Sequence, residues 1–311
     1  MEKQHFNFLS MIRAPFLSSI ISPILIGTIL AYYIGRNFDL VNFIIVFMLG
    51  IFFHVTTNVY NDIYDTLQGT DEINVNRNEF SGGSGVLVKD PSALPVMYRI
   101  ARFSLIGTLL ASLVLYFRIE DNLKIILIVL ACLSAFFSKY YTAAPLKLAY
   151  RGWGEFSVWF AFGPMAITVA VISQNISLSS TVFAAMPFTG ISTLSILLIG
   201  QIIDYDADKA AGKWGIAVRL GKRFAGIFYI VVQICLCINI IVLSMLFLDH
   251  SWIILISLVP YILLFPKLIK TLLVHFNDVE ILKTAARQNV LLHLSFSFLV
   301  VISFLVSIFM N

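Results

Sequence analysis

Nine long apolar runs constrain the fold of this chain more than any other feature of its sequence. A helix needs about 20 apolar residues to cross a bilayer. Only 12% of the 311 residues are charged, whereas soluble domains carry about a quarter. The candidate spans are residues 16–34, 41–60, 97–117, 123–143, 155–173, 179–203, 224–247, 252–271 and 289–310. The sequence therefore predicts an all-α protein, a polytopic membrane bundle of about nine helices that forms a single domain over residues 1–311.

Lysine and arginine set the expected orientation, because they concentrate on the cytoplasmic side of membrane proteins. With the N-terminus inside, 18 of the 21 basic residues lie on the inner side, and only Arg36, Arg118 and Lys124 lie outside. We therefore expect a multi-pass protein of the cell's inner (plasma) membrane, with a cytoplasmic N-terminus and an outer C-terminus. The net charge of +4 is no sign of nucleic-acid binding, because the basic residues are distributed by topology. The lipid bilayer is an expected partner, and nucleic acid is not.

Two polar segments follow apolar runs and gather most of the carboxylates. They are expected as cytoplasmic loops at about 61–96 and 204–223, after the second and sixth spans. Carboxylates at a membrane edge are costly and usually functional, and loops of this length in compact proteins are usually functional as well. We expect ordered caps over a site on the cytoplasmic face. The four-span interval between the segments suggests two four-helix units with one additional helix.

Helical spacing places oxygen ligands on common faces within both segments. Residues i and i+4 share a face, which pairs Asn61 with Asp65 and Asp204 with Asp208. Mg²⁺ prefers such oxygen ligands and binds through a few carboxylates together with water or substrate phosphates. The sequence therefore predicts one Mg²⁺ site with these four residues as metal ligands. Asp62 points about 100° away from this face and is expected to pair with a basic residue.

Basic residues on the same membrane face indicate an anionic substrate. The glycine run Ser81–Gly85 could present backbone amides to an oxyanion, and a plain flexible loop explains it equally well. Bound cations neutralise a leaving diphosphate, and aromatic walls shelter an allylic cation, so the combination favours a lipid diphosphate. The residues expected to contact substrate are Asn58, Arg77, Lys139, Lys209, Lys213 and Gln201. His54, one turn before Asn58, is interpreted as a hydrogen-bonded packing residue rather than a ligand.

These motifs resemble those of the UbiA superfamily of intramembrane prenyltransferases. That superfamily carries Asn-Asp-x-x-Asp after its second helix and Asp-x-x-x-Asp after its sixth, and both are present here as Asn61–Asp65 and Asp204–Asp208. The sequence is most similar to the menaquinone-pathway branch, the 1,4-dihydroxy-2-naphthoate polyprenyltransferases. The further motifs shared with that branch are Gly69-x-Asp71, Gly82–Leu87, Tyr141–Glu155, Phe162-Gly163-Pro164, Gly212-Lys213 and Ala217–Gly221.

The resemblance implies a nine-span bundle and a Mg²⁺-dependent transfer of a polyprenyl group from polyprenyl diphosphate to an aromatic acid. In the branch concerned the acceptor is 1,4-dihydroxy-2-naphthoate. The candidate catalytic residues for such a reaction are Asp62, Asp71, Lys139, Tyr141 and Glu155.

Two departures from the branch leave the acceptor open. Gln201 stands where Asn is usual, and Ile203 where Arg is common. The alternatives within the superfamily are other acceptors (a hydroxybenzoate, homogentisate, haem or a glyceryl ether) and cyclisation of the prenyl group without an acceptor. A transporter also accommodates buried acids, but transporters hold their ions near the membrane midplane, whereas these acids lie at the ends of spans.

Overall fold

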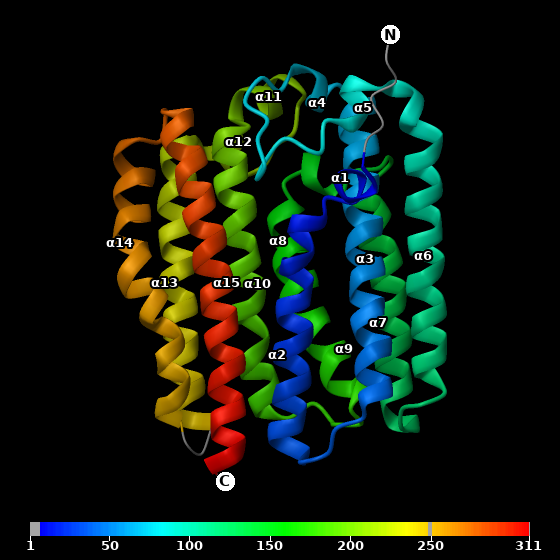
Figure 1. Cartoon of the computed structure of the whole chain (residues 1–311). Coiled ribbons are helices and arrows are strands. Elements are labelled where there is room, and N and C mark those ends of the chain that lie inside the picture. Colours follow the sequence, from blue (N-terminus) through cyan, green and yellow to red (C-terminus); the bar gives the residue numbers. More distant parts are fainter. Residues whose placement is uncertain (1–6, 248–250, 311) are drawn as a thin grey trace.

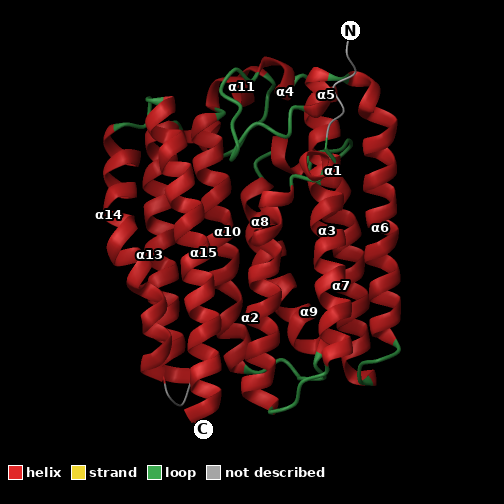
Figure 2. Cartoon of the chain, viewed as in Figure 1, coloured by secondary structure: helices red, strands yellow, loops and turns green. Residues whose placement is uncertain are grey.

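The computed structural model describes residues 7–247 and 251–310, and within these ranges the regular structure is helical (Figures 1 and 2). Nine helices of the described part are long and apolar enough to cross a membrane. The predicted all-α class is therefore confirmed, and the protein is a multi-pass membrane protein.

The spans and the short elements between them follow in chain order. The spans are η1–α2 (Ala14–Leu17, Ser18–Gly35), α3 (Leu40–Leu67), η2–α6 (Pro91–Ala93, Leu94–Tyr116), α7 (Asp121–Tyr140), α8–η4–α9 (Gly154–Phe160, Ala161–Met165, Ala166–Ser173), α10 (Ser180–Ile203), α13 (Lys222–Phe247), η5–α14 (Ser251–Leu258, Val259–Val274) and α15 (Val279–Met310). The short elements are α1 (Phe8–Met11), α4 (Thr70–Ile73), α5 (Val86–Lys89), η3 (Leu148–Tyr150), α11 (Tyr205–Ala210) and α12 (Ile216–Leu220).

Helix α3 is longer than the sequence pattern predicted, so the first acidic cluster begins within the helix and not in a loop. The apolar run ends near residue 60, but the helix continues to Leu67. Polar contacts between successive turns support this extension: Asn61 donates to Asp65 (2.9 Å), and Thr66 donates to the Asp62 carbonyl (2.8 Å). Gly69, with φ of +80°, then turns the chain away. Residues 61–67 are thus helical, and the predicted loop begins after them.

The spans pack in two groups with α2 between them. Spans two to five (α3, α6, α7 and α8–α9) contact one another, and so do spans six to nine (α10, α13, α14 and α15). Helix α2 contacts α9 and α15, which are the last spans of the two groups. Figure 1 shows the groups on either side of α2. This packing follows the division into two four-helix units and one additional helix that the spacing of the acidic segments suggested.

Short helices form a cap at one end of the bundle. Figure 1 shows α4, α5, α11 and α12 at the same end as α1, and α15 finishes at the opposite end. Helices α4 and α11 contact each other, so the segments after spans two and six meet over the ends of α3 and α10. Short helices and turns of these two segments thus cover this end of the bundle. Asn311, expected on the outer side, lies outside the described residues.

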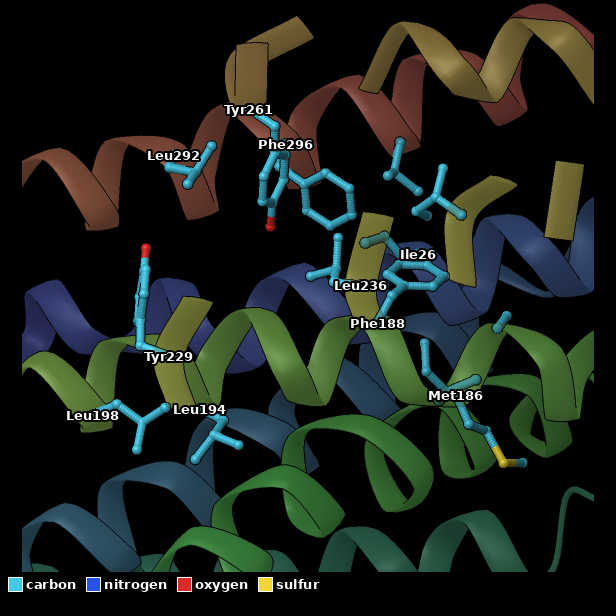
Figure 3. Close-up of a cluster of buried hydrophobic side chains, with 14 of the residues drawn as sticks. Ile26, Met186, Phe188, Leu194, Leu198, Tyr229, Leu236, Tyr261, Leu292 and Phe296 are labelled. Atoms are coloured by element: carbon cyan, nitrogen blue, oxygen red, sulfur yellow. The ribbon is translucent and has the colours of Figure 1, made fainter. Parts of the chain in front are cut away.

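Aromatic packing fills the core of the second helix group. The rings of Phe188 and Phe296 lie 5.9 Å apart, and those of Tyr261 and Phe296 lie 5.6 Å apart, both with edge-to-face geometry. Figure 3 shows Tyr261 and Phe296 side by side between neighbouring helices. Edge-to-face pairs are favourable beyond their buried area, so these rings stabilise the packing of α10, α14 and α15.

Two glycines allow span five to cross α10 closely. A Cβ atom at Gly163 would lie 2.6 Å from the Met186 carbonyl oxygen, and one at Gly190 would collide with the Trp159 carbonyl. Small residues at such crossings let two membrane helices approach. The crossing brings the cap-side half of span five against α10, where both helices contribute to the wall of the cavity described below.

We expect Gly190→Ala to lower the free energy of unfolding by about 1–3 kcal/mol, because the added methyl group must displace the backbone of span five. Gly200→Ala is the matched control on the same helix, since the nearest atom to a Cβ there is 3.7 Å away. The control should be neutral or stabilising by up to about 1 kcal/mol, because alanine favours helix over glycine. Thermal unfolding in detergent compares the two variants, and equal stability of the two would contradict the close crossing.

Candidate active site

The cap-side ends of α3 and α10 face a cavity of about 190 Å³. Acidic and basic side chains line the part next to the cap, whereas residues one or more turns further along α3, α7 and span five make the inner part largely apolar. The residues of the inner wall include Phe53, Phe137, Val158, Ala161, Phe162 and Leu197. Of the residues predicted to form the site, the cavity is lined by Asn58, Asn61, Asp65, Asp71, Tyr141, Gln201, Asp204, Asp208 and Lys213.

Asp65 is the central residue of the first cluster. It lies in the last turn of α3, is 4% exposed and accepts hydrogen bonds from Asn61 (2.9 Å) and the Tyr150 hydroxyl (2.7 Å). The hydroxyls of Tyr150 and Thr70 lie 2.6 Å apart, which ties the start of α4 to the same point. A network of this kind holds the carboxylate in one orientation toward the cavity.

The second cluster lies at the junction of α10 and α11. Asp204 links the two helices and accepts a hydrogen bond from Asn74 (2.8 Å), which follows α4. Asp208 lies one turn later in α11, and its carbonyl accepts from the Lys213 backbone N–H (2.8 Å). The segment after span two therefore orients a carboxylate of the segment after span six.

Lys213 joins the two clusters across the cavity. Its Nζ lies 2.9 Å from Asp65 and 3.9 Å from Asp208. Burial alone would lower the pKa of Lys213, but the two carboxylates raise it well above its usual value. The lysine is therefore charged, and its ammonium group occupies the position of a cation between carboxylates from two different spans.

The cavity nevertheless carries an excess of acid. Among the described residues, four carboxylates line it (Asp65, Asp71, Asp204 and Asp208), against two cations, Lys213 and Arg13. Burial raises the pKa of Asp204, and it raises that of Asp208 to about 7. Burial and the neighbouring Asp65 raise the pKa of Asp71 to about 8. Added positive charge would stabilise all of these carboxylates in their ionised form.

The donor set and charge of this cavity fit a divalent cation. Within the described part of the chain, no three His, Cys, Asp or Glu residues are close enough together to hold a metal ion by themselves. Mg²⁺ does not require such a cluster, because it binds through one or two carboxylates and takes its other ligands from water or phosphate. The Lys213 ammonium between Asp65 and Asp208 marks where positive charge is stable.

Asp62 does not line the cavity, and its carboxylate contacts other groups of the protein. It pairs with Arg13 (3.6 Å), as the sequence predicted for a basic partner, and accepts a hydrogen bond from the Ser84 backbone N–H (3.1 Å). A Cβ atom at Gly83, where φ is +71°, would lie 2.6 Å from the Asp71 carboxylate. The Ser81–Gly85 run is therefore folded tightly against the acids, and its Ser84 amide is used by Asp62.

Four other predicted residues also lie outside the cavity wall, which corrects the expectation that they face a substrate there. Arg77 donates to the backbone carbonyls of Gly82 (2.6 Å) and Asp71, so its guanidinium braces the loop. Lys139 and Lys209 lie over the rings of their neighbours Tyr140 and Tyr205.

Glu155, the fourth of these residues, is buried behind the wall. It accepts hydrogen bonds from Gln201 (2.8 Å) and from the Ile216 backbone N–H (2.7 Å) at the start of α12. These two donors account for the orientation of the carboxylate away from the cavity. Glu155 therefore positions Gln201 and α12.

Three residues of the site did not follow from the sequence pattern. Arg13 was counted only for orientation, yet it lines the cavity and contacts Asn61 (3.4 Å) and Asp62. Asn74 and Tyr150 were not singled out, although each hydrogen-bonds a carboxylate of one cluster. Tyr150 lies within the Tyr141–Glu155 stretch that carried part of the sequence resemblance. Arg13 and Asn74 carry no local signal, because their roles depend on contacts over long sequence distances.

Comparison with known proteins gives the family. The sequence profile described as the UbiA prenyltransferase family matches residues 93–278, which is more than half of the chain. The chain belongs to the UbiA prenyltransferase family. The matched range contains the second acidic cluster, and the first cluster precedes it.

Individual UbiA relatives extend the similarity. A 2-carboxy-1,4-naphthoquinone phytyltransferase of Synechocystis is 29% identical over 70% of this chain and 66% of that protein. A 1,4-dihydroxy-2-naphthoate octaprenyltransferase of Bacillus subtilis is 25% identical over 65% of this chain and 62% of that protein. The alignments thus span slightly less than two thirds of these relatives. A UbiA homolog from Archaeoglobus fulgidus has the same fold, with a TM-score of 0.61 at 14% identity over 95% of this chain and 99% of that one.

We expect Lys213→Gln to lower the free energy of unfolding by about 3 kcal/mol, because it leaves buried Asp65 and Asp208 without their shared cation. Lys222→Gln is the matched control, since Lys222 pairs with exposed Asp206 (3.5 Å) in the same cap. The control should cost less than about 1 kcal/mol, as exposed pairs contribute little. Thermal unfolding measures both variants, and a Lys213→Gln protein as stable as the control would contradict the bridging role.

Proposed function

We propose that this chain transfers a polyprenyl group from a polyprenyl diphosphate to an aromatic acid, 1,4-dihydroxy-2-naphthoate, in a Mg²⁺-dependent reaction of menaquinone biosynthesis. One observation carries the proposal: acidic clusters from spans two and six face the same cavity and share the Lys213 ammonium. The charged end of the cavity suits a diphosphate, and the aromatic and aliphatic wall beyond it suits a hydrocarbon chain.

The relatives support the same reaction class. The Synechocystis and Bacillus proteins are named for phytyl or octaprenyl transfer to naphthoate-type acceptors, and the Archaeoglobus structure is of a protein bound to DMAPP and Mg²⁺. Because this chain belongs to the same family, we assign it a similar prenyl donor and a similar aromatic acceptor.

Asn61, Asp65, Asp204 and Asp208 are the residues that would hold Mg²⁺, since their oxygens line the charged end of the cavity. When bound, the metal neutralises charge on the diphosphate as it leaves. Lys213 and Arg13 are the cations of the cavity wall, and both can donate to phosphate oxygens. The chain's own cations thereby add to the same stabilisation.

The remaining residues define the path of the reaction. The bond between the prenyl C1 and the diphosphate oxygen breaks, and its electron pair leaves with the diphosphate. The rings of Phe53, Phe137 and Phe162 line the cavity and shelter the allylic cation that remains. The ring carbon that bears the carboxylate attacks C1, and loss of CO₂ restores the aromatic ring. Tyr141, at the cavity wall, is proposed to orient the reacting groups.

We expect Asp208→Asn to reduce transfer at least about 100-fold, because it removes a negative ligand where charge must be stabilised. Asp206→Asn is the matched control: it lies in the same short helix but is exposed and pairs with Lys222. Purified variants would be incubated with geranylgeranyl diphosphate, Mg²⁺ and 1,4-dihydroxy-2-naphthoate, and the prenylated product measured by mass spectrometry.

The control should retain activity within about threefold of wild type, the range of minor surface changes. Near-normal transfer by Asp208→Asn would contradict the two-cluster site. A cyclised hydrocarbon formed equally well without an acceptor would overturn the transferase proposal and favour a terpene cyclase.

We also propose that the cap lies on the cytoplasmic side. Cysteines introduced at exposed Glu79 in the cap and at Asp121 at the other end of the bundle report the two faces. In spheroplasts of cells that carry a cysteine-free background, an impermeant maleimide should label Asp121→Cys and leave Glu79→Cys unlabelled until the membrane is opened. The reverse labelling pattern would show that the cap faces the outer side and would contradict the proposed orientation.

A further inference from the structure

The carboxylate of Asp65 is already engaged by donors of the protein itself. Its Oδ1 atom accepts a hydrogen bond from the Tyr150 hydroxyl (2.7 Å). Its Oδ2 atom accepts hydrogen bonds from the Asn61 amide (2.9 Å) and from the Lys213 Nζ (2.9 Å). A carboxylate oxygen has two lone-pair sites, so both sites of Oδ2 are in use. This oxygen can bind a metal ion only if one of its two donors leaves.

Lys213 is the donor whose side chain can leave without moving a helix. Asn61 lies one turn before Asp65 on α3, so the helix fixes the distance between these two residues. Lys213 lies between α11 and α12, lines the cavity and is 19% exposed in its side chain. Its ammonium group ends a flexible four-carbon stem. A change in side-chain torsions is therefore enough to release Asp65.

The backbone around Lys213 is held in place by hydrogen bonds. Its N–H donates to the Asp208 carbonyl (2.8 Å), and the N–H of Trp214 donates to the Tyr150 carbonyl (3.0 Å). The Cα atom of Lys213 thus stays beside both acidic clusters while the ammonium group changes its partner. A side chain that leaves Asp65 still reaches a ligand in the cavity.

A divalent cation bound by Asp65 and Asp208 would repel the ammonium group. Nζ lies 2.9 Å from Asp65 and 3.9 Å from Asp208, and both carboxylates are among the proposed Mg²⁺ ligands. Like charges only a few Å apart in a buried site repel strongly. A diphosphate in the cavity offers the ammonium group new anionic acceptors, and charge-assisted hydrogen bonds to phosphate are strong.

We infer that Lys213 is an exchangeable cation that couples the binding of Mg²⁺ to the binding of the diphosphate. In the free protein it pairs with Asp65 and Asp208, and on metal binding it releases them and pairs with phosphate oxygens. The inference rests on the proposed prenyl transfer and extends it to the filling of the site. Mg²⁺ alone competes with the lysine, whereas Mg²⁺ with diphosphate provides the displaced ammonium group with a partner, so the two ligands bind cooperatively.

The test measures binding to the purified protein without turnover. Mn²⁺ accepts the same oxygen ligands as Mg²⁺, and its binding in the absence of diphosphate is followed by electron paramagnetic resonance. Binding of geranylgeranyl thiolodiphosphate at saturating Mg²⁺ is measured by calorimetry. The variant is Lys213→Gln. Lys222→Gln is the matched control, because the Lys222 side chain in the same cap is 14% exposed and pairs with Asp206.

We expect Lys213→Gln to bind Mn²⁺ alone about tenfold more tightly and the thiolodiphosphate about tenfold less tightly, within the usual range of coupling between two ligands. These opposite changes identify the exchange, because a purely structural role for Lys213 would weaken both ligands. The control should bind both ligands as wild type does. Unchanged or weaker Mn²⁺ binding by folded Lys213→Gln would overturn the inference.

A second measurement on wild type decides the question if Lys213→Gln fails to fold. Acetic anhydride labels lysine amines, and mass spectrometry compares the labelling of Lys213 with that of Lys222. Mg²⁺ alone should increase the labelling of Lys213 and leave Lys222 unchanged, because only the first lysine is displaced from its carboxylates. Added thiolodiphosphate should reverse the increase. Labelling of Lys213 that does not respond to Mg²⁺ would contradict the exchange.

Failure of the proposed function gives a different result. Wild type would then form no prenylated product from geranylgeranyl diphosphate and 1,4-dihydroxy-2-naphthoate. Failure of the inference alone leaves transfer by wild type intact, and only the binding and labelling patterns of Lys213 depart from those expected.

Discussion

The ion pair between Lys213 and Asp65 is the contact on which the geometry of the site depends. Its two residues come from the ends of different helix groups, and the ammonium also faces Asp208. Without a cation at this point, carboxylates from spans two and six would repel one another across a cavity of low polarity. The pair therefore holds the two groups together at the cap and orients the acids toward the cavity.

The hydrogen bonds around this pair cross between the segments in the same way. Asn74, from the segment after span two, orients Asp204 at the end of span six, and Tyr150 orients Asp65. Glu155 in turn connects span five to Gln201 and the start of α12. Each cluster is thus positioned by residues outside it, so the cap and the ends of the spans form one structural unit.

The sequence predicted the features that depend on local pattern. Apolar runs located the nine spans found in the described part of the chain, and the i, i+4 rule paired Asn61 with Asp65, which are hydrogen-bonded at 2.9 Å. The sequence could not predict which charged residues reach the cavity, because that depends on helix rotation and on competing backbone acceptors. Arg77 is taken up by loop carbonyls, whereas Arg13, about 50 residues from the first cluster, lines the cavity.

The central claim is that the two clusters form one binding site, and a double-mutant cycle tests it directly. Affinity for geranylgeranyl thiolodiphosphate in the presence of Mg²⁺ would be measured for wild type, Asp65→Asn, Asp208→Asn and the double variant. A shared site predicts that the two losses are coupled by at least about 1 kcal/mol. Losses that add within about 0.3–0.5 kcal/mol would show independent sites and contradict the claim.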